Sequence, residues 1–342
     1  MSGPAAMTER ERNMSGTRLE RRGLLAASAG ALLAPRLARA QGAGGRTIRI
    51  VVGFPAGQAT DIVARLWAER MAEGARDVFI VDNRPGQGGS MALGQVARAA
   101  PDGTTMMLAH MSALATNPHL YRNVAYDTLR DFDAAGLMAD LPFVLVCNPQ
   151  LPVRNLEELV RYARANPDRL SNASSGNGTV SHLAMEEFKR LAGGLSITHV
   201  PYRGSALGVT DVMTGTVQLA LETAASTIPH IQSGRLRALA AGTSRRLERL
   251  PDLPTFQEQG FPGFTAVTWL MVIYPAGVPR ELLTQTHAAI ERTMRVPEIE
   301  RRLLAIGAIP RYSASPDEAA AYMREEFRRW GEVVRRSGVT LD

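Results

Sequence analysis

Two loops of this sequence combine glycines with hydroxyl and amide side chains, a pattern suited to holding an anion. Residues 53–61 read Gly-Phe-Pro-Ala-Gly-Gln-Ala-Thr-Asp, and residues 174–182 read Ser-Ser-Gly-Asn-Gly-Thr-Val-Ser-His. Glycine lets the backbone approach a ligand closely, and the first N–H groups of a following helix are free to donate. We predict carboxylate binding by backbone N–H groups, assisted by Gln58 and Thr60. A third candidate is His110-Met111-Ser112 with Ala115-Thr116-Asn117, which follows the predicted strand ending at Ala109. The alternative is that each loop only turns the chain and caps its own helix.

The same residue types could serve catalysis, but their spacing argues against it. Ser174 and Ser175 with a histidine would suggest a hydrolase, with Asp61 as the third member. The sequence has no Gly-x-Ser-x-Gly elbow, however, and His182 falls at the start of a predicted helix. Six histidines stand at positions 110, 119, 182, 199, 230 and 287, none three or four residues from another, so no zinc site is predicted. We expect no enzyme activity, no metal and no cofactor, and a hydrolase remains the less favoured alternative.

Composition and charge exclude other classes of protein. Of the 342 residues, 45% are hydrophobic and 21% charged, which suits a soluble chain with two α/β lobes. The formal net charge is +6, but residues 1–40 carry seven basic and three acidic residues, a net of +4, which leaves +2 for the rest. The remaining arginines form no basic stripe, so nucleic-acid binding is not expected. Cys147 is the single cysteine, so no intrachain disulfide is possible.

Residues 1–40 have the features of an export signal. Arg21 and Arg22 precede an Ala- and Leu-rich stretch that ends in Ala-Arg-Ala at residues 38–40, a signal peptidase pattern that predicts cleavage near Ala40/Gln41. The apolar stretch is shorter than the roughly 20 residues that span a bilayer. The paired arginines favour the twin-arginine route, and an ordinary secretory signal is the alternative. The sequence therefore predicts a periplasmic protein.

Beyond this segment, strands and helices alternate, which predicts a parallel sheet covered by helices. The predicted strands are residues 47–52, 78–81, 105–109, 196–200 and 217–221. Asn155 and Glu158 form a capping signature at the start of one helix. Ser315 and Pro316 open the C-terminal helix, and a short helix is predicted at 231–234.

A series of short motifs stands in a fixed order along the chain. They lie at residues 50–57, 60–65, 82–89, 100–104, 172–179, 199–205, 228–231, 234–240 and 253–256. Through them the chain resembles the substrate-binding proteins of tripartite tricarboxylate transporters, the Bug or TctC-type family, over nearly all of residues 46–340.

The resemblance implies an α/β, two-lobed periplasmic-binding-protein fold of type II, a Venus flytrap with two crossovers between its lobes. We expect residues 41–143 to form the first part of lobe 1, residues 144–265 lobe 2, and residues 266–342 the return to lobe 1. A monomer is expected.

The resemblance also implies which residues bind the ligand, with the two glycine-containing loops gripping a carboxylate from opposite lobes. In the first loop these are Phe54, Ala56, Gly57, Gln58, Thr60 and Asp61. In the second they are Ser174, Ser175, Asn177, Gly178 and Thr179. Ser112, Tyr202 and Glu222 complete the predicted site.

Two positions depart from the pattern of the family. Gln58 replaces a glycine of the first loop, which adds a donor but narrows the freedom of the backbone. Glu222 stands in a Leu-Glu-Thr stretch where a Phe-Asp-Asn-like stretch is usual. If its side chain faces the ligand, it would repel a second carboxylate or favour an amine.

The implied function is capture of a small organic anion: a dicarboxylate or tricarboxylate, an aromatic acid or an acidic amino acid. The partners would be the two membrane subunits of a tripartite tricarboxylate-type transporter. The alternative is a ligand sensor that docks on a membrane signalling receptor.

Overall fold

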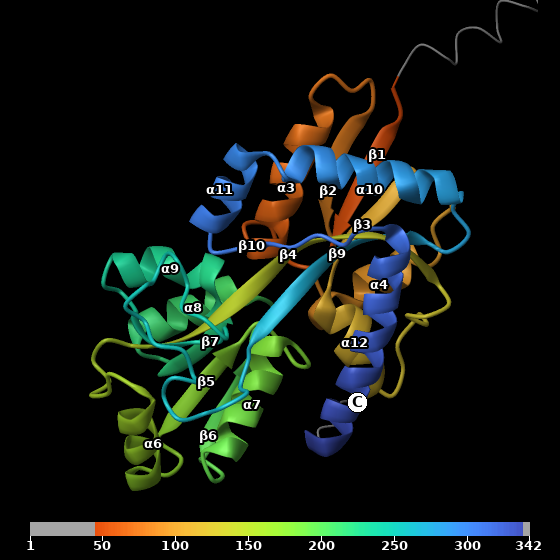
Figure 1. Cartoon of the computed structure of the whole chain (residues 1–342). Helices are drawn as coiled ribbons and strands as arrows, with labels where there is room; N and C mark the ends of the chain where they lie inside the picture. Colours follow the sequence, from red (N-terminus) through yellow and green to blue (C-terminus); the bar gives the residue numbers. More distant parts are fainter. Residues whose placement is uncertain (1–44, 338–342) are drawn as a thin grey trace, which may run out of the picture. The chain divides into compact units, whose positions relative to one another are not determined.

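The computed structural model describes residues 45–337 and shows a mixed α/β fold (Figure 1). The export segment predicted at residues 1–40 lies outside the described residues. The strands are β1 (Thr47–Val52), β2 (Val78–Asn83), β3 (Thr105–His110), β4 (Phe132–Cys147), β5 (Leu170–Ser174), β6 (Ile197–Pro201), β7 (Leu219–Thr223), β8 (Arg237–Ala241), β9 (Val267–Pro275) and β10 (Ile309–Pro310). The helices are α3 (Ala59–Ala72), α4 (Ser90–Val96), α5 (Asn117–Leu120), α6 (Leu156–Ala165), α7 (Val180–Leu191), α8 (Ser205–Thr214), α9 (Ala224–Gln232), α10 (Arg280–Met294), α11 (Pro297–Ala305) and α12 (Pro316–Ser337).

The strands are arranged in the order β2-β1-β3-β9-β4-β7-β5-β6, with β8 and β10 also paired to β4. β1 pairs in parallel with β2 and β3, and β5 pairs in parallel with β6 and β7. A helix links each strand of these groups to the next along the chain: α3 and α4 in the first group, and α7 and α8 in the second. Such a connection is usual between parallel strands. The alternation read from the sequence therefore predicts the local architecture correctly.

One long strand, β4, belongs to both groups of strands. Its residues 132–142 pair with β9, whereas residues 143–147 pair with β7 and β8. We call β1, β2, β3, β9, β10 and the 132–142 part of β4 the first half-sheet. The second half-sheet contains β5, β6, β7, β8 and the 143–147 part of β4. Figure 1 shows β4 and β9 side by side between the helices that cover the two half-sheets.

Buried apolar side chains explain why these segments form strands and helices. Thr47–Val52 is rich in β-branched residues and its last three residues are buried, as expected for a strand in a parallel sheet. Trp67 on α3 is fully buried against this sheet together with Ile50. In the second half-sheet, Phe188 of α7 packs edge to face on Phe256. Cys147 is buried at the end of β4.

The predicted caps of two helices were found, and one predicted helix differs from the structure. The side chain of Asn155 accepts a hydrogen bond from the Glu158 N–H at 2.8 Å, and that of Ser315 accepts one from the Glu318 N–H at 3.1 Å. The prediction of a helix at 231–234 was wrong, because α9 runs over Ala224–Gln232 and contains Pro229. Proline lacks an N–H and usually marks the start of a helix, but here tertiary packing keeps it inside one.

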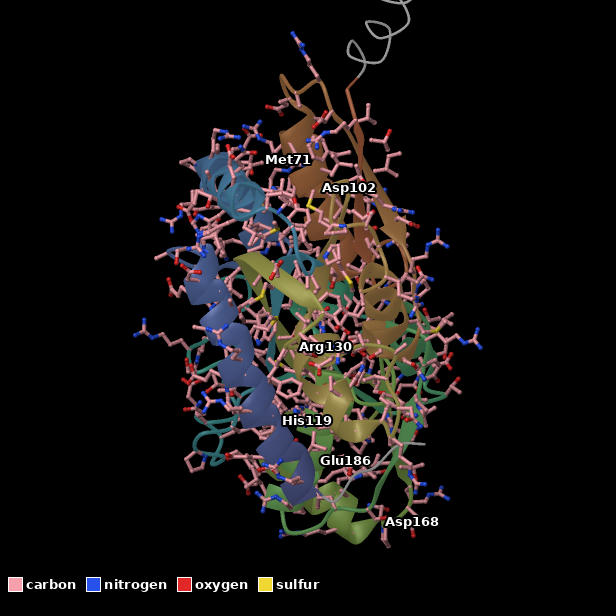
Figure 2. All side chains as sticks on the ribbon, turned by 90° about the vertical axis from the view of Figure 1, so that its right-hand side faces the viewer. Met71, Asp102, His119, Arg130, Asp168 and Glu186 are labelled. Atoms are coloured by element: carbon pink, nitrogen blue, oxygen red, sulfur yellow. The ribbon has the colours of Figure 1, made fainter. Side chains whose placement is uncertain are left out.

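The C-terminal helix α12 contacts two other helices, α5 and α7. The His119 ring, at the end of α5, lies 4.3 Å from that of Phe327, and its Nε2 lies 2.9 Å from the Phe327 carbonyl oxygen. Closer to the C-terminal end of α12, Val334 belongs to one hydrophobic cluster with Leu183 of α7. Figure 2 shows His119 beside this helix, between Asp102 near one end of the view and Asp168 near the other. Helix α12 therefore packs on α5, which follows β3 of the first half-sheet, and on α7, which follows β5 of the second.

Candidate functional site

A small cavity lies where the first loop meets the second half-sheet. Its volume is about 20 Å³, enough for about one water molecule. It is lined by Phe54, Gln58, Ala59, Thr60, His110, Leu141, Phe143, Ser175, Thr179, Ser205, Glu222 and Thr223. Two loops far apart in sequence are thus brought together, along with the point where β4 changes partners.

Four helices begin at this cavity. Ala59 is the first residue of α3 and Ser205 the first of α8, while Thr179 and Thr223 are the N-caps of α7 and α9. The N-terminus of a helix carries a partial positive charge and N–H groups without partners inside the helix. None of the four has a side-chain cap hydrogen bond. The cavity is therefore surrounded by donors and partial positive charge, an arrangement that favours an anion.

Asp61 holds the first loop in shape. Its carboxylate accepts hydrogen bonds from the Gly57 N–H at 2.8 Å, from Asn83 Nδ2 at 2.9 Å and from Arg65 Nε at 2.9 Å. Burial opposes ionisation, but these hydrogen bonds outweigh it and lower the pKa of Asp61. Asp61 thus positions the loop and does not line the cavity. Ala56 and Gly57, also predicted to bind the ligand, are exposed on the outer side of this turn.

Gln58 brings an unsatisfied donor to the cavity. Its side chain is buried, with 9% exposed, and its Nε2 atom has no hydrogen-bond partner. The amide lies so close to Gly204 that a Cβ atom there would come within 2.0 Å of Nε2. A buried donor without a partner is costly in a folded protein, so Gln58 Nε2 is available to a ligand.

The second loop is held by two stacked histidines. The rings of His182 and His199 lie 3.9 Å apart and nearly parallel. His182 Nδ1 accepts a hydrogen bond from the Gly178 N–H at 3.3 Å, and His199 Nε2 lies 2.6 Å from Ser174 Oγ. Burial lowers the pKa of both rings, that of His199 to about 3. The two neutral rings hold the second loop through these hydrogen bonds. The Ser174 hydroxyl is therefore bonded to His199 and does not line the cavity.

The remaining predicted residues of the site lie around the cavity without lining it. The carbonyl oxygen of Gly178 accepts a hydrogen bond from Thr116 Oγ1 at 2.9 Å, and that of Asn177 faces the Tyr121 hydroxyl at 3.5 Å. Tyr202 donates to Asp211 at 2.5 Å. Ser112 is fully buried, and its hydroxyl has no partner. Of the predicted set, Phe54, Gln58, Thr60, Ser175, Thr179 and Glu222 line the cavity.

His110, from the third candidate loop, also lines the cavity. Five lining residues were missed by the sequence analysis: Ala59, Leu141, Phe143, Ser205 and Thr223. Ser205 could have been found, because serine and glycine are both common at the start of a helix. Leu141 and Phe143 lie in a strand whose apolar pattern indicates only burial. Burial lowers the pKa of His110 to about 3, so this ring is neutral in the cavity.

Glu222 places a carboxyl group in the same cavity. Only 2% of the residue is exposed, and its Oε1 accepts a hydrogen bond from Ser181 Oγ at 3.0 Å. Burial raises the pKa of Glu222 to about 7, although hydrogen bonds from Ser181, Ser175 and the Thr223 backbone act in the opposite direction. The sequence analysis drew a consequence for the case in which Glu222 faces the ligand, and in the structure this residue does line the candidate cavity.

A separate, larger cavity of about 540 Å³ lies between α12, β10 and residues 243–249. Its buried charges are already paired within the protein. Arg311 lies 3.1 Å from Asp140, and Glu326 accepts from Trp269 Nε1 at 2.9 Å. The smaller cavity is the better candidate because it brings the two predicted loops together and holds the free donor Gln58 Nε2. Within residues 45–337, no cluster of potential metal ligands and no helix long and apolar enough to cross a membrane was found.

Comparison with known proteins identifies the family of the chain. Residues 63–339 match the family described as the tripartite tricarboxylate transporter family receptor. The chain is 34% identical to Rpa4515 of R. palustris, solved with adipate, with a TM-score of 0.83 and coverage of 86% of this chain and 98% of that one. For MatC (Rpa3494) from Rhodopseudomonas palustris with bound malate, the identity is 30%, the TM-score 0.79, and the coverage 84% and 99%.

A third structure, the periplasmic binding protein BugD, is 32% identical with a TM-score of 0.81 and coverage of 86% of this chain and 98% of that one. These similarities confirm the periplasmic-binding-protein fold that the motif series implies. The chain therefore belongs to the tripartite tricarboxylate transporter receptor family and is a solute-binding protein of the Bug and TctC type, not an enzyme.

Proposed function

We propose that this protein captures a small carboxylate in the periplasm and delivers it to the membrane subunits of a tripartite tricarboxylate-type transporter. The observation that carries the proposal is the convergence of four helix N-termini on one inter-loop cavity. The partial positive charges of these helix N-termini, together with the free donor Gln58 Nε2, supply the attraction for a carboxylate without an arginine or lysine. The adipate and malate bound by two solved relatives support an acid of this size.

Residues from both loops would share the binding. Gln58 and Thr60 donate from the first loop, and Ser175 and Thr179 from the second, while Phe54 covers the carbon chain. Asp61, Ser174, Asn177 and Gly178 shape these loops from outside the cavity, and Ala56, Gly57, Ser112 and Tyr202 support them. We add three further residues to the proposed site because they line the cavity: His110, Ser205 and Thr223.

Location and organisation complete the proposal. The periplasmic location rests on the periplasmic relatives and on the signal predicted in residues 1–40, cleaved near Ala40. We propose lobe boundaries after residue 143, one residue beyond the point where β4 changes partners, and after residue 265, just before β9. The protein would act as a monomer. Delivery to a signalling receptor is the alternative, which uptake measurements in a deletion strain distinguish from transport.

Thermal unfolding with a panel of carboxylates tests the proposal. At least one acid should stabilise the protein by about 2–4 kcal/mol at concentrations well above its Kd. Gln58→Leu keeps the size of the side chain but removes the donor, and should weaken binding about tenfold. Gln95→Leu changes an exposed glutamine on α4 and should leave binding unchanged. If no carboxylate stabilises the protein, the proposed function is wrong.

A further inference from the structure

The cavity contains a carboxylate but no cationic side chain to compensate it. Among the twelve residues that line it, none is lysine or arginine, and the only histidine, His110, is neutral because burial lowers its pKa to about 3. Glu222 is 2% exposed and its hydrogen bonds come from hydroxyl and backbone donors. A buried carboxylate is normally paired with a positive charge. Glu222 therefore has no cationic side chain in the cavity wall to pair with, and only hydroxyl and backbone donors near the starts of α7 and α9 offset its charge.

The two sides of the cavity offer opposite chemistry. Gln58, from the first loop, presents a buried N–H donor without a partner, next to the N-terminus of α3. Glu222, at the end of β7 in the second half-sheet, presents an acceptor. A ligand that satisfies both groups needs an acceptor for Gln58 and a donor for Glu222. A carboxylate meets the first need and an ammonium group meets the second.

We propose that Glu222 selects a ligand that carries an ammonium group as well as a carboxylate, which makes this receptor specific for an amino acid. The inference rests on the proposed function, because it assumes that the cavity holds an acid. A hydroxyl group would satisfy one lone pair of Glu222 but not its charge. A second ligand carboxylate would be repelled by Glu222 unless a proton were taken up on binding.

The test compares acids that differ by one group. Calorimetry would measure straight-chain monocarboxylates and dicarboxylates of three to six carbons, each with its 2-amino derivative. The wild-type protein should bind at least one 2-amino acid ten or more times tighter than its parent acid. In Glu222→Gln, which keeps shape but loses charge, that preference should fall at least tenfold. Glu187→Gln, at an exposed position on α7, is the matched control and should keep the wild-type preference.

Proton exchange gives an independent readout on the wild-type protein. At pH 7 a carboxyl group with a pKa of about 7 is half protonated. An ammonium group beside it favours the ionised form, so binding should release up to about half a proton per ligand. Titrations in two buffers of different ionisation enthalpy measure this number and its sign. Uptake of a proton would mean that the ligand brings a second carboxylate.

The outcomes separate this inference from the function on which it rests. If a dicarboxylate binds the wild-type protein more tightly than every 2-amino acid, with the same order in Glu222→Gln, the role of Glu222 is refuted and carboxylate capture stands. If none of the acids binds either protein, the proposed function fails, and the inference fails with it.

Discussion

Protonation of Glu222 changes both the charge inside the cavity and the stability of the folded protein. Burial raises its pKa from an ordinary 4.5 to about 7. The folded protein therefore holds this proton more tightly than the unfolded chain does. The stabilisation from the bound proton is complete below about pH 4.5 and is lost as the pH rises through about 7.

The first prediction at this scale concerns Glu222→Gln without ligand. At pH 8 the wild-type protein carries a buried charge that the variant lacks, so the variant should be more stable by up to about 3 kcal/mol. At pH 4.5 the two proteins should differ much less. Denaturant unfolding at several pH values measures the difference, and Glu187→Gln provides the surface control. A difference that does not change with pH would show that Glu222 titrates normally.

At the scale of elements, the second loop packs closely against the start of α5. Gly178 has φ +75°, and a Cβ atom there would lie 2.5 Å from Asn117 Oδ1. Gly263 has nearly the same backbone angle, φ +76°, but nothing lies within 4 Å of its position. Alanine at either site should cost roughly 1 kcal/mol of stability through backbone strain. Only the change at Gly178 also forces the loop away from α5.

Gly178→Ala should therefore weaken ligand binding about tenfold, whereas Gly263→Ala should bind like the wild-type protein at a similar loss of stability. Measuring affinity and unfolding free energy for both variants separates the two effects. Equal affinity in the two variants would mean that the contact between the loop and α5 does not matter for the site.

The elements themselves follow from local patterns, and this is why the sequence predicts them. β-branched runs predict β1, and the Asn155 and Ser315 caps place two helix starts. The position of Pro229 inside α9 could not be predicted, because packing outweighs the local preference of proline for a helix start. Likewise, no local pattern shows that Phe143 lies in the cavity wall. An apolar strand residue has the same sequence pattern whether it lines a cavity or packs in the core.

At the scale of the whole described chain, the cavity of about 20 Å³ is too small for an acid of several carbons. We therefore expect the two loops to separate before they close on the ligand, and we predict that β4 and β9, which lie between the two half-sheets, are the segments that bend. The hydrogen bond from Thr116 Oγ1 to the Gly178 carbonyl, 2.9 Å long, joins elements from the two sides. We expect this hydrogen bond to stabilise a closed arrangement of the two loops, although neither Thr116 nor Gly178 lines the cavity.

Removing this hydrogen bond should shift the equilibrium toward the open form. Thr116→Val should weaken ligand binding about fivefold, corresponding to about 1 kcal/mol. Thr116 also donates to the Ser112 carbonyl four residues earlier. Thr293→Val is the matched control, since Thr293 donates only to the Ala289 carbonyl, four residues earlier in α10. Unchanged affinity in Thr116→Val would argue that closure does not depend on this bond.

Cys147 has a practical consequence for following such a movement. It is the only cysteine of the chain and is fully buried, and burial raises the pKa of its thiol to about 11. Thiol reagents attack the thiolate, so the native protein offers them almost nothing to modify. A cysteine engineered at a surface position would take up a fluorescent dye at that position alone, and the receptor could report its own ligand as an optical sensor without any native residue being replaced first.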